Sequence, residues 1–362
     1  MNKIYALHRR NSMKLCLRAE TKPFEKRRAL SPQDVAKLKQ QNISILVESC
    51  PQSIFSAEEY AAVGAEVIEK GAWKTLPKEW IILGLKELEE SNEPLIHTHI
   101  YFAHCYKHQE GWQALLKRFH QGGGQLYDLE YLVENGRRIA AFGYWAGYAG
   151  AALSWALWQA EKQGALSSFD IPYSFASVDA LQAHLKAFYA QDELSAIVIG
   201  ALGRSGKGAT DFLKSMSCSV AEWDQAETQK GGPFPELLSY DLLINCVLMT
   251  SPNPPFISKE LLTHNKKLSL IGDVSCDPTG PYNSLPIYTQ ATTFDKPLVK
   301  VNESAHNLYV MAIDHLPSLL PKESSEDFSA QLLPYLLDMS GTAWQHADDW
   351  FQRFIRQAIT AH

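Results

Sequence analysis

Short apolar runs alternate with amphipathic segments through the first third of the chain. Four runs with apolar cores predict β-strands, at residues 14–20, 43–49, 79–87 and 98–105. Between them, apolar residues recur at helical spacing and predict helices at residues 31–41, 56–64 and 110–121, the first two with a Ser at the N-cap position. Strands and helices that alternate in this way predict a mostly parallel sheet with both faces covered.

The same pattern resumes near residue 193 and predicts a second α/β domain. Its predicted elements are strands at 195–202, 219–224, 241–248 and 267–275, with a helix near 207–217. The last amphipathic stretch, residues 342–359, follows this second region. We expect it to return and pack on the first domain, so that the final helix and the N-terminal region share one core.

Residues 140–158 form the longest uncharged stretch singled out in the chain, "AAFGYWAGYAGAALSWALW". The length approaches that of a membrane span, and Gly143 and Gly147 have the spacing of a close helix contact. The stretch is rich in Gly, Ala and aromatic residues rather than in Leu, Ile and Val, and no second candidate accompanies it. It therefore predicts a buried helix packed closely between the two domains.

A glycine-rich turn follows the first strand of the second region, in "AIVIGALGRSGKGATDFL". A phosphate loop of the Walker type is disfavoured, because Ala201 and Gly208 occupy positions that this motif reserves for Gly and Ser/Thr. Gly200, Gly203 and Gly206 instead match a loose dinucleotide turn, and Asp224 ends the next strand, where an acidic residue takes the ribose hydroxyls. An ordinary βα turn is the alternative. The pattern favours dinucleotide binding.

These features together predict two Rossmann-like α/β domains with an interdomain cleft. Ligands of such sheets gather at the carboxyl ends of the strands. The expected division is a substrate-binding domain of residues 1–142 with 325–362, and an NAD-binding domain of residues 143–324.

Composition narrows the class of protein without changing this picture. The chain has 362 residues, 46% of them hydrophobic and 20% charged, which is typical of an ordinary globular protein. A net charge of -6 and the lack of Lys/Arg tracts disfavour nucleic acid and anionic membrane as main partners. The six cysteines lack a C-x-x-C pair, and no export or organelle signal is recognised, so a cytoplasmic location is expected. A monomer is compatible with the sequence, which does not fix the oligomeric state.

Titratable residues gather after three predicted strands of the first domain. The groups are Lys22, Glu25, Lys26, Arg27 and Arg28; then Lys86 and Glu87; then His97, His99, His104, Cys105, Lys107 and His108. The histidines lack the spacing of a zinc site, so a metal centre is disfavoured and surface or core histidines are the simpler interpretation. Adjacent strand residues point to opposite faces, so Glu87 is expected to point away from Lys86.

Eight motifs in order resemble the NAD-dependent, lysine-forming saccharopine dehydrogenases of the α-aminoadipate pathway of lysine biosynthesis. They cover roughly residues 14–335 and read "LRAETKPFEKRRALSP", "GLKE", "FAHCYKHQEGW", "YDLEYL", "GRRIAAFG", "GALGRSGKGA", "NCVL" and "IDHLPSLLP". The resemblance implies an oxidoreductase that reversibly cleaves saccharopine to L-lysine and 2-oxoglutarate with NAD⁺.

The resemblance also implies roles for individual residues. Lys86 is expected to take the proton of the substrate's secondary amine, and His104 to act as acid and base in imine hydrolysis. A lysine base needs burial or neighbouring cations to lower its pKa, and Lys22, Arg27 and Lys107 are the candidates for those cations. His104 titrates near neutrality without such help.

The remaining implied roles concern the substrate carboxylates and the cofactor. Fork-shaped guanidinium groups suit carboxylates. The implied substrate residues are Arg27 and Arg138, with Gln109 and Phe142 lining the pocket and Lys22 and Lys107 nearby. The implied NAD residues are Arg137, Gly203, Arg204, Asp224, Thr228, Val274, Ile313, Asp314, His315 and Leu316.

Two positions depart from the family pattern. Ser205 stands where a Cys is expected, so a thiol effect at that turn is expected to be absent. Leu248 stands where an aromatic residue is expected near the cofactor, which puts that contact in doubt. Two other functions stay open at this point: an amino-acid dehydrogenase of the alanine dehydrogenase type, and a catalytically silent NAD(H)-binding protein.

Overall fold

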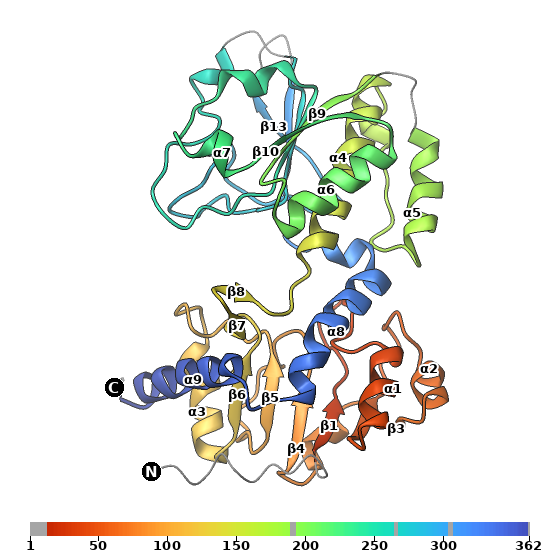
Figure 1. The fold of residues 1–362 in the computed structure, drawn as a ribbon, viewed down its shortest axis with the longest axis vertical. Helices are drawn as coiled ribbons and strands as arrows, with labels where there is room; N and C mark the ends of the chain where they lie inside the picture. Colours follow the sequence, from red (N-terminus) through yellow and green to blue (C-terminus); the bar gives the residue numbers. More distant parts are fainter. Residues whose placement is uncertain (1–12, 189–192, 264–266, 303–306, 361–362) are drawn as a thin grey trace. The chain divides into compact units, whose positions relative to one another are not determined.

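The computed structural model describes residues 13–188, 193–263, 267–302 and 307–360 (Figure 1). Contacts between Cα atoms divide the chain into two compact units, Met1–Ala141 with Pro321–His362, and Phe142–Leu320. The second unit thus begins at residue 142 and the chain re-enters the first unit at residue 321, where the sequence suggested 143 and 325.

A six-stranded sheet, parallel throughout, forms the centre of the first unit. Its strand order is β3-β2-β1-β4-β5-β6. The strands are β1 (Lys14–Leu17), β2 (Ser44–Glu48), β3 (Glu66–Ile68), β4 (Trp80–Leu83), β5 (Thr98–Tyr101) and β6 (Gln125–Asp128). The helices are α1 (Pro32–Gln40), α2 (Ala57–Ala62), α3 (Trp112–Gly122), α8 (Pro321–Leu337) and α9 (Thr342–Thr360). The predicted parallel sheet is confirmed.

Local sequence explains where these helices begin and how the last one docks. Ser31 and Ser56 cap α1 and α2 by accepting a backbone N–H with the side-chain oxygen, as predicted. Helix α9 packs on α3 and β6 (Figure 1). Phe351 and Phe354 enter the same core as Phe119. The predicted return of the final helix to the first domain is confirmed.

The second unit also has a six-stranded sheet, in the order β10-β9-β11-β12-β14-β13. All its pairings are parallel except that of β13 with β14. The strands are β9 (Ser195–Ile199), β10 (Ser219–Trp223), β11 (Leu242–Asn245), β12 (Leu270–Asp273), β13 (Val299–Asn302) and β14 (Leu308–Met311). The helices are α4 (Gly143–Lys162), α5 (Val178–Leu185), α6 (Arg204–Ser215) and α7 (Gln225–Thr228).

The uncharged stretch singled out in the sequence is α4, and it belongs to the core of the second unit. The prediction of a buried helix is confirmed, and its packing between the domains stays a prediction. Its main partner is α6, because Gly147 and Gly208 let the two backbones meet: a Cβ on Gly147 would lie 1.7 Å from the carbonyl oxygen of Ser205, and one on Gly208 would lie 1.9 Å from that of Tyr144. None of the helices in the described ranges combines the length and the apolar character that a membrane crossing requires.

Candidate active site

The chemistry-bearing residues of the first unit lie in the loops that follow the strands. Strand β4 ends at Leu83, and the half-buried Lys86 follows it at the carboxyl edge of the sheet. Burial opposes ionisation of Glu25, but Arg27 and, to a smaller extent, Lys86 lower its pKa. The ammonium group of Lys86 thus acts on the same buried carboxylate as Arg27 does.

His104 is bonded to Glu87, a contact that the sequence interpretation did not include. The distance from His104 Nδ1 to Glu87 Oε1 is 2.7 Å. The bond to Glu87 raises the pKa of His104 against the effect of burial. Burial alone would raise the pKa of Glu87, but the bond from His104 and further contacts lower it to about 2. Glu87 also contacts Lys22, and the expectation that it points away from Lys86 stays a prediction.

The backbone and ring of His104 are also fixed in place. His104 has a φ of 51°, in the left-handed region that most residues avoid. Its ring stacks on Phe102 with 6.0 Å between the ring centroids and 20° between the planes. A ring held on one face and at Nδ1 leaves Nε2 as the nitrogen available for proton transfer.

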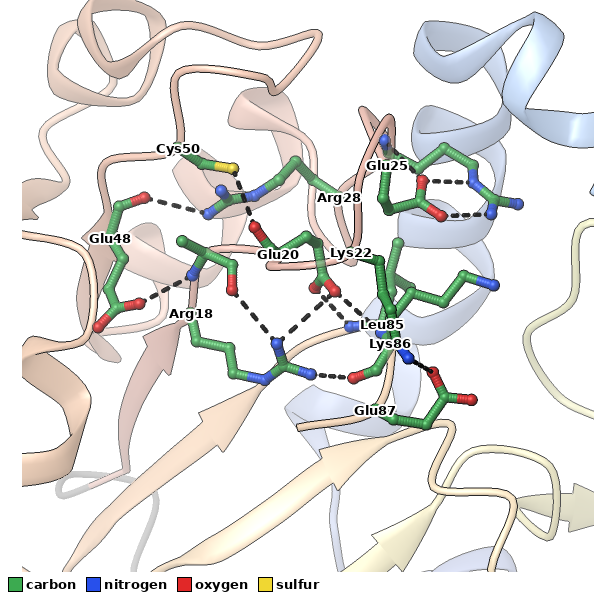
Figure 2. Close-up of polar contacts among 12 residues, drawn as sticks. Arg18, Glu20, Lys22, Glu25, Arg28, Glu48, Cys50, Leu85, Lys86 and Glu87 are labelled. Atoms are coloured by element: carbon green, nitrogen blue, oxygen red, sulfur yellow. Dashed lines mark hydrogen bonds and ion pairs between the residues drawn. The ribbon is translucent and has the colours of Figure 1, made fainter. Parts of the chain in front are cut away.

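Each cation expected to act on Lys86 is paired with a carboxylate. Lys22 Nζ lies 3.7 Å from Glu87 Oε2 (Figure 2), and Lys107 Nζ lies 2.5 Å from Glu130 Oε1. Arg27 is buried and donates Nε and Nη2 to the two oxygens of Glu25, at 2.7 and 2.6 Å. The sequence interpretation included none of these pairings, and they reduce the net positive charge around Lys86.

The other residues assigned to the substrate lie in both units. Gln109 Oε1 accepts the backbone N–H of Lys107 at 2.9 Å. Arg137 and Arg138 are exposed on β8 (Arg137–Arg138), which pairs with β7 (Val133–Glu134) in a small hairpin. Phe142 is the residue before α4 and belongs to the second unit.

The glycine turn of the second unit has the geometry that a dinucleotide needs. Gly200 has a φ of 82°, and a Cβ on Gly206 would lie 2.0 Å from the carbonyl oxygen of Gly200. Gly203 occupies the N-cap of α6 and offers no side chain to the helix N-terminus. The first turn of α6 thus presents backbone N–H groups, the donors that bind pyrophosphate in such turns. The residues present fit NAD.

Asp224 lies beside this turn. Its Oδ2 accepts the backbone N–H of Leu202 at 2.8 Å, and its Oδ1 accepts that of Gln225 at 2.8 Å. The hydroxyl of Thr228 donates to the backbone carbonyl of Asp224 at 2.8 Å. The carboxylate is therefore held at the end of β10, next to the glycine turn, where a ribose-binding acid stands in this fold.

The remaining residues assigned to NAD border the same sheet. Val274 follows β12, and its backbone N–H bonds to the carbonyl oxygen of Asn245. After β14, Ile313 and Leu316 are buried, whereas Asp314 and His315 are exposed. Arg204 and Ser205 open α6. The side chain of Leu248 is exposed.

The sequence interpretation missed two acidic residues, Asp128 and Glu130, that act electrostatically on His104. Asp128 ends β6 with a fully buried side chain, and burial raises its pKa to about 6. Glu130 pairs with Lys107. The motif "YDLEYL" contained the signal, because two acids directly after an apolar strand are unusual without a partner.

The histidine cluster divides between site and core. His97 and His99 are buried, and His99 packs edge-on against Trp73 at 5.1 Å between centroids. Burial lowers the pKa of His99, so the ring is neutral. Among the described residues, no group of three or more His, Cys, Asp or Glu side chains is arranged to hold a metal ion.

Comparisons with known proteins identify the class. The family models for the alanine dehydrogenase/PNT N-terminal and C-terminal domains match residues 16–149 and 212–362. A solved L-alanine dehydrogenase superposes with a TM-score of 0.65 at 15% identity and covers 96% of this chain and 99% of its own, which shows the fold alone. The chain thus has the two-domain fold of the alanine dehydrogenase and transhydrogenase class.

Sequence relatives give the family within this class. Proteins named saccharopine dehydrogenase [NAD(+), L-lysine-forming] are 46% identical in Candida glabrata, over 96% of this chain and 98% of that protein, and 43% identical in Schizosaccharomyces pombe, over 95% and 98%. The chain belongs to the family of NAD⁺-dependent, L-lysine-forming saccharopine dehydrogenases. The resemblance read from the eight motifs is confirmed.

Proposed function

We propose that this protein catalyses the reversible oxidative cleavage of saccharopine to L-lysine and 2-oxoglutarate, with Lys86 and His104 as its proton carriers. The observation that supports the assignment of roles is the bond between His104 and Glu87, because it orients the imidazole toward the loop that carries Lys86, after the neighbouring strands β4 and β5. The names of the relatives support the choice of substrate.

The reaction needs a base before any hydride can leave. The secondary amine of saccharopine is protonated in water, and its lone pair must be freed before the neighbouring carbon gives up hydride. Lys86, at the carboxyl edge of the sheet, accepts that proton. When bound, NAD⁺ supplies the hydride acceptor, and Gly203, Arg204 and Asp224 are the residues that would hold it at the glycine turn.

Imine hydrolysis then requires several proton transfers at one place. His104 serves as base when water adds to the imine carbon and as acid when the lysine amine departs. Glu87 accepts a hydrogen bond from Nδ1–H, so Nε2 makes these transfers. The negative charge of Glu87 stabilises the imidazolium that forms. Raising the pKa of His104 increases its protonated fraction near neutral pH, which suits the acid step.

The substrate carboxylates need cationic partners, and the first unit provides them. Arg138 lies exposed on β8. Arg27 is oriented by its two bonds to Glu25, so the guanidinium is held in one plane. Arg138 and Arg27 bind carboxylates of saccharopine, with Lys22, Lys107, Gln109 and Phe142 bordering the substrate. Arg137 borders the cofactor, as do Thr228, Val274, Ile313, Asp314, His315 and Leu316.

Substrate pairs offered to the purified protein test this proposal. NADH absorbance should fall when L-lysine and 2-oxoglutarate are both present, and should stay constant when either is left out. Pyruvate with ammonia is the control for an alanine dehydrogenase activity. NADH loss with pyruvate and ammonia, without loss with lysine and 2-oxoglutarate, would overturn the assignment.

A further inference from the structure

Two charged side chains next to β1 hold both backbone polar groups of Lys86 (Figure 2). Glu20 Oε2 accepts the backbone N–H of Lys86 at 2.9 Å, and Glu20 Oε1 accepts that of Leu85 at 2.7 Å. Arg18 Nη2 donates to the backbone carbonyl of Lys86. Together these contacts form an Arg18–Glu20 bracket around the peptide units of Lys86.

The Arg18–Glu20 bracket is buried, so forming it costs desolvation free energy. The side chains of Arg18 and Glu20 are 2% and 1% exposed, and Arg18 Nη1 lies 3.6 Å from Glu20 Oε2. Removing two charges from water costs free energy that their attraction often fails to recover, so a buried ion pair is weak evidence for a role in stability. Within the described part of the chain, Arg18 Nε has no hydrogen-bond partner, which adds to that cost. A function other than stability is therefore indicated.

The surroundings of Arg18 leave its guanidinium little freedom. A Cβ on Gly84 would lie 2.4 Å from Arg18 Nε, so the guanidinium occupies the space that a side chain at this position would fill. The guanidinium also lies over the ring of Tyr101, 5.5 Å from its centroid. Packing thus holds Arg18 in the orientation that meets the carbonyl of Lys86.

We propose that Arg18 and Glu20 are positioning residues that fix the direction in which the Lys86 side chain leaves the backbone. Lys86 lies beyond the end of β4. The last backbone bond toward the neighbouring strand is the one that the carbonyl of Leu85 accepts from the N–H of Phe102 at 3.0 Å, and the N–H and C=O of Lys86 itself are held by the bracket. A lysine side chain is long and flexible, and anchoring its backbone limits the volume that the amine samples. This inference rests on the proposed role of Lys86 as a base.

Replacing Glu20 by Gln gives the principal test. The amide keeps one acceptor but turns an NH₂ group toward a backbone N–H of Leu85 or Lys86, so the bracket opens on one side. We expect kcat with lysine and 2-oxoglutarate to fall about 10- to 100-fold, the scale of a misplaced catalytic group, while KM for NADH is unchanged. Gly84→Ala displaces the guanidinium of Arg18 and should act in the same direction, which provides the test if Glu20→Gln does not fold.

Glu48→Gln is the matched control. Glu48 is as buried as Glu20 and also accepts two backbone N–H groups, from Ala19 and Trp73, both at 2.9 Å, but it does not bond residues 85–87. Glu48→Gln should lower the thermal unfolding midpoint about as much as Glu20→Gln does, and should leave kcat near the wild-type value. Equal losses of kcat in Glu20→Gln and Glu48→Gln would show a merely structural role and overturn the inference.

A double-mutant cycle separates this inference from the function on which it rests. If Glu20 acts through Lys86, then Glu20→Gln should have no further effect on kcat in a Lys86→Met background. An undiminished effect there overturns the bracket. Lys86→Met with wild-type turnover overturns the role of Lys86 itself, and the bracket with it. A slow Lys86→Met beside a fully active Glu20→Gln overturns the bracket alone.

Discussion

Replacing Glu87 by Gln should lower the free energy of unfolding by an amount that depends on pH. The substitution keeps the shape of the side chain and removes the charge that meets His104 at 2.7 Å. Hydrogen bonds to charged groups contribute about 1.5–3 kcal/mol. Both side chains are more than a third exposed, at 41% and 35%, so solvent screening reduces the expected contribution to about 1 kcal/mol or less.

The pKa shifts of His104 and Glu87 define the pH range in which their pair stabilises the fold. The pKa of His104 is raised above its usual 6.5, so its contribution is complete below pH 6.5 and is lost as the pH rises through the folded-state pKa. The pKa of Glu87 is lowered from 4.5 to about 2, so its contribution is complete above pH 4.5 and is lost as the pH falls toward 2. The pair therefore stabilises the fold most between pH 4.5 and 6.5.

Thermal unfolding at two pH values measures this effect. At about pH 5.5 the midpoint of Glu87→Gln should lie below that of the wild type by at most about 2–4 °C. At about pH 9 the difference should be smaller, because only the exposed pair of Glu87 with Lys22 then remains to be lost. Glu79→Gln is the control, because the partner of Glu79 is a lysine, Lys14, at 3.0 Å, and not a histidine. The kinetic ionisation assigned to His104 should also move to lower pH. An equal destabilisation by Glu87→Gln at both pH values would refute the reasoning.

Cofactor choice, metal independence and the glycine turn supply further tests. Asp224 should favour NAD over NADP, because its carboxylate repels a 2′-phosphate; equal kcat/KM for the two cofactors would show that it is misplaced. Exhaustive chelation should leave turnover unchanged, and inactivation that Zn²⁺ reverses would revive a metal site. Gly206→Ala should abolish NADH binding measured by fluorescence, since its Cβ would lie 2.0 Å from the carbonyl oxygen of Gly200, and wild-type affinity would contradict this geometry.

The fold was largely predictable because its signals are local. Apolar runs bounded by polar segments located the main parallel strands, and two serines marked the starts of α1 and α2. Helix α8 escaped prediction, because its serine-rich first half is typical of a loop. Those serines have distant partners: the hydroxyl oxygens of Ser325 and Ser329 accept the backbone N–H groups of Arg28 and Ser31.

The sequence proposed site residues one by one but not the network of contacts between them. Family motifs named Lys86 and His104, and local sequence alone would have left both as ordinary polar residues. The partners of these residues depend on where strands end and on which strands are neighbours. Glu20 meets Lys86 because β1 and β4 are adjacent in the sheet, although the two residues are far apart in the chain. Sequence order does not contain that adjacency.

The pH dependence of kcat in the wild type and in Lys86→Met and His104→Gln tests the central claim most directly. Each substitution should lower kcat by about 10²- to 10⁴-fold, the usual contribution of a positioned acid or base, and should leave NADH affinity unchanged. The wild type should show two ionisations that belong to the interacting pair, and each variant should lose or displace one of them. Near-normal turnover with an unchanged pH profile in both variants would contradict the assignment of Lys86 and His104 as the proton carriers.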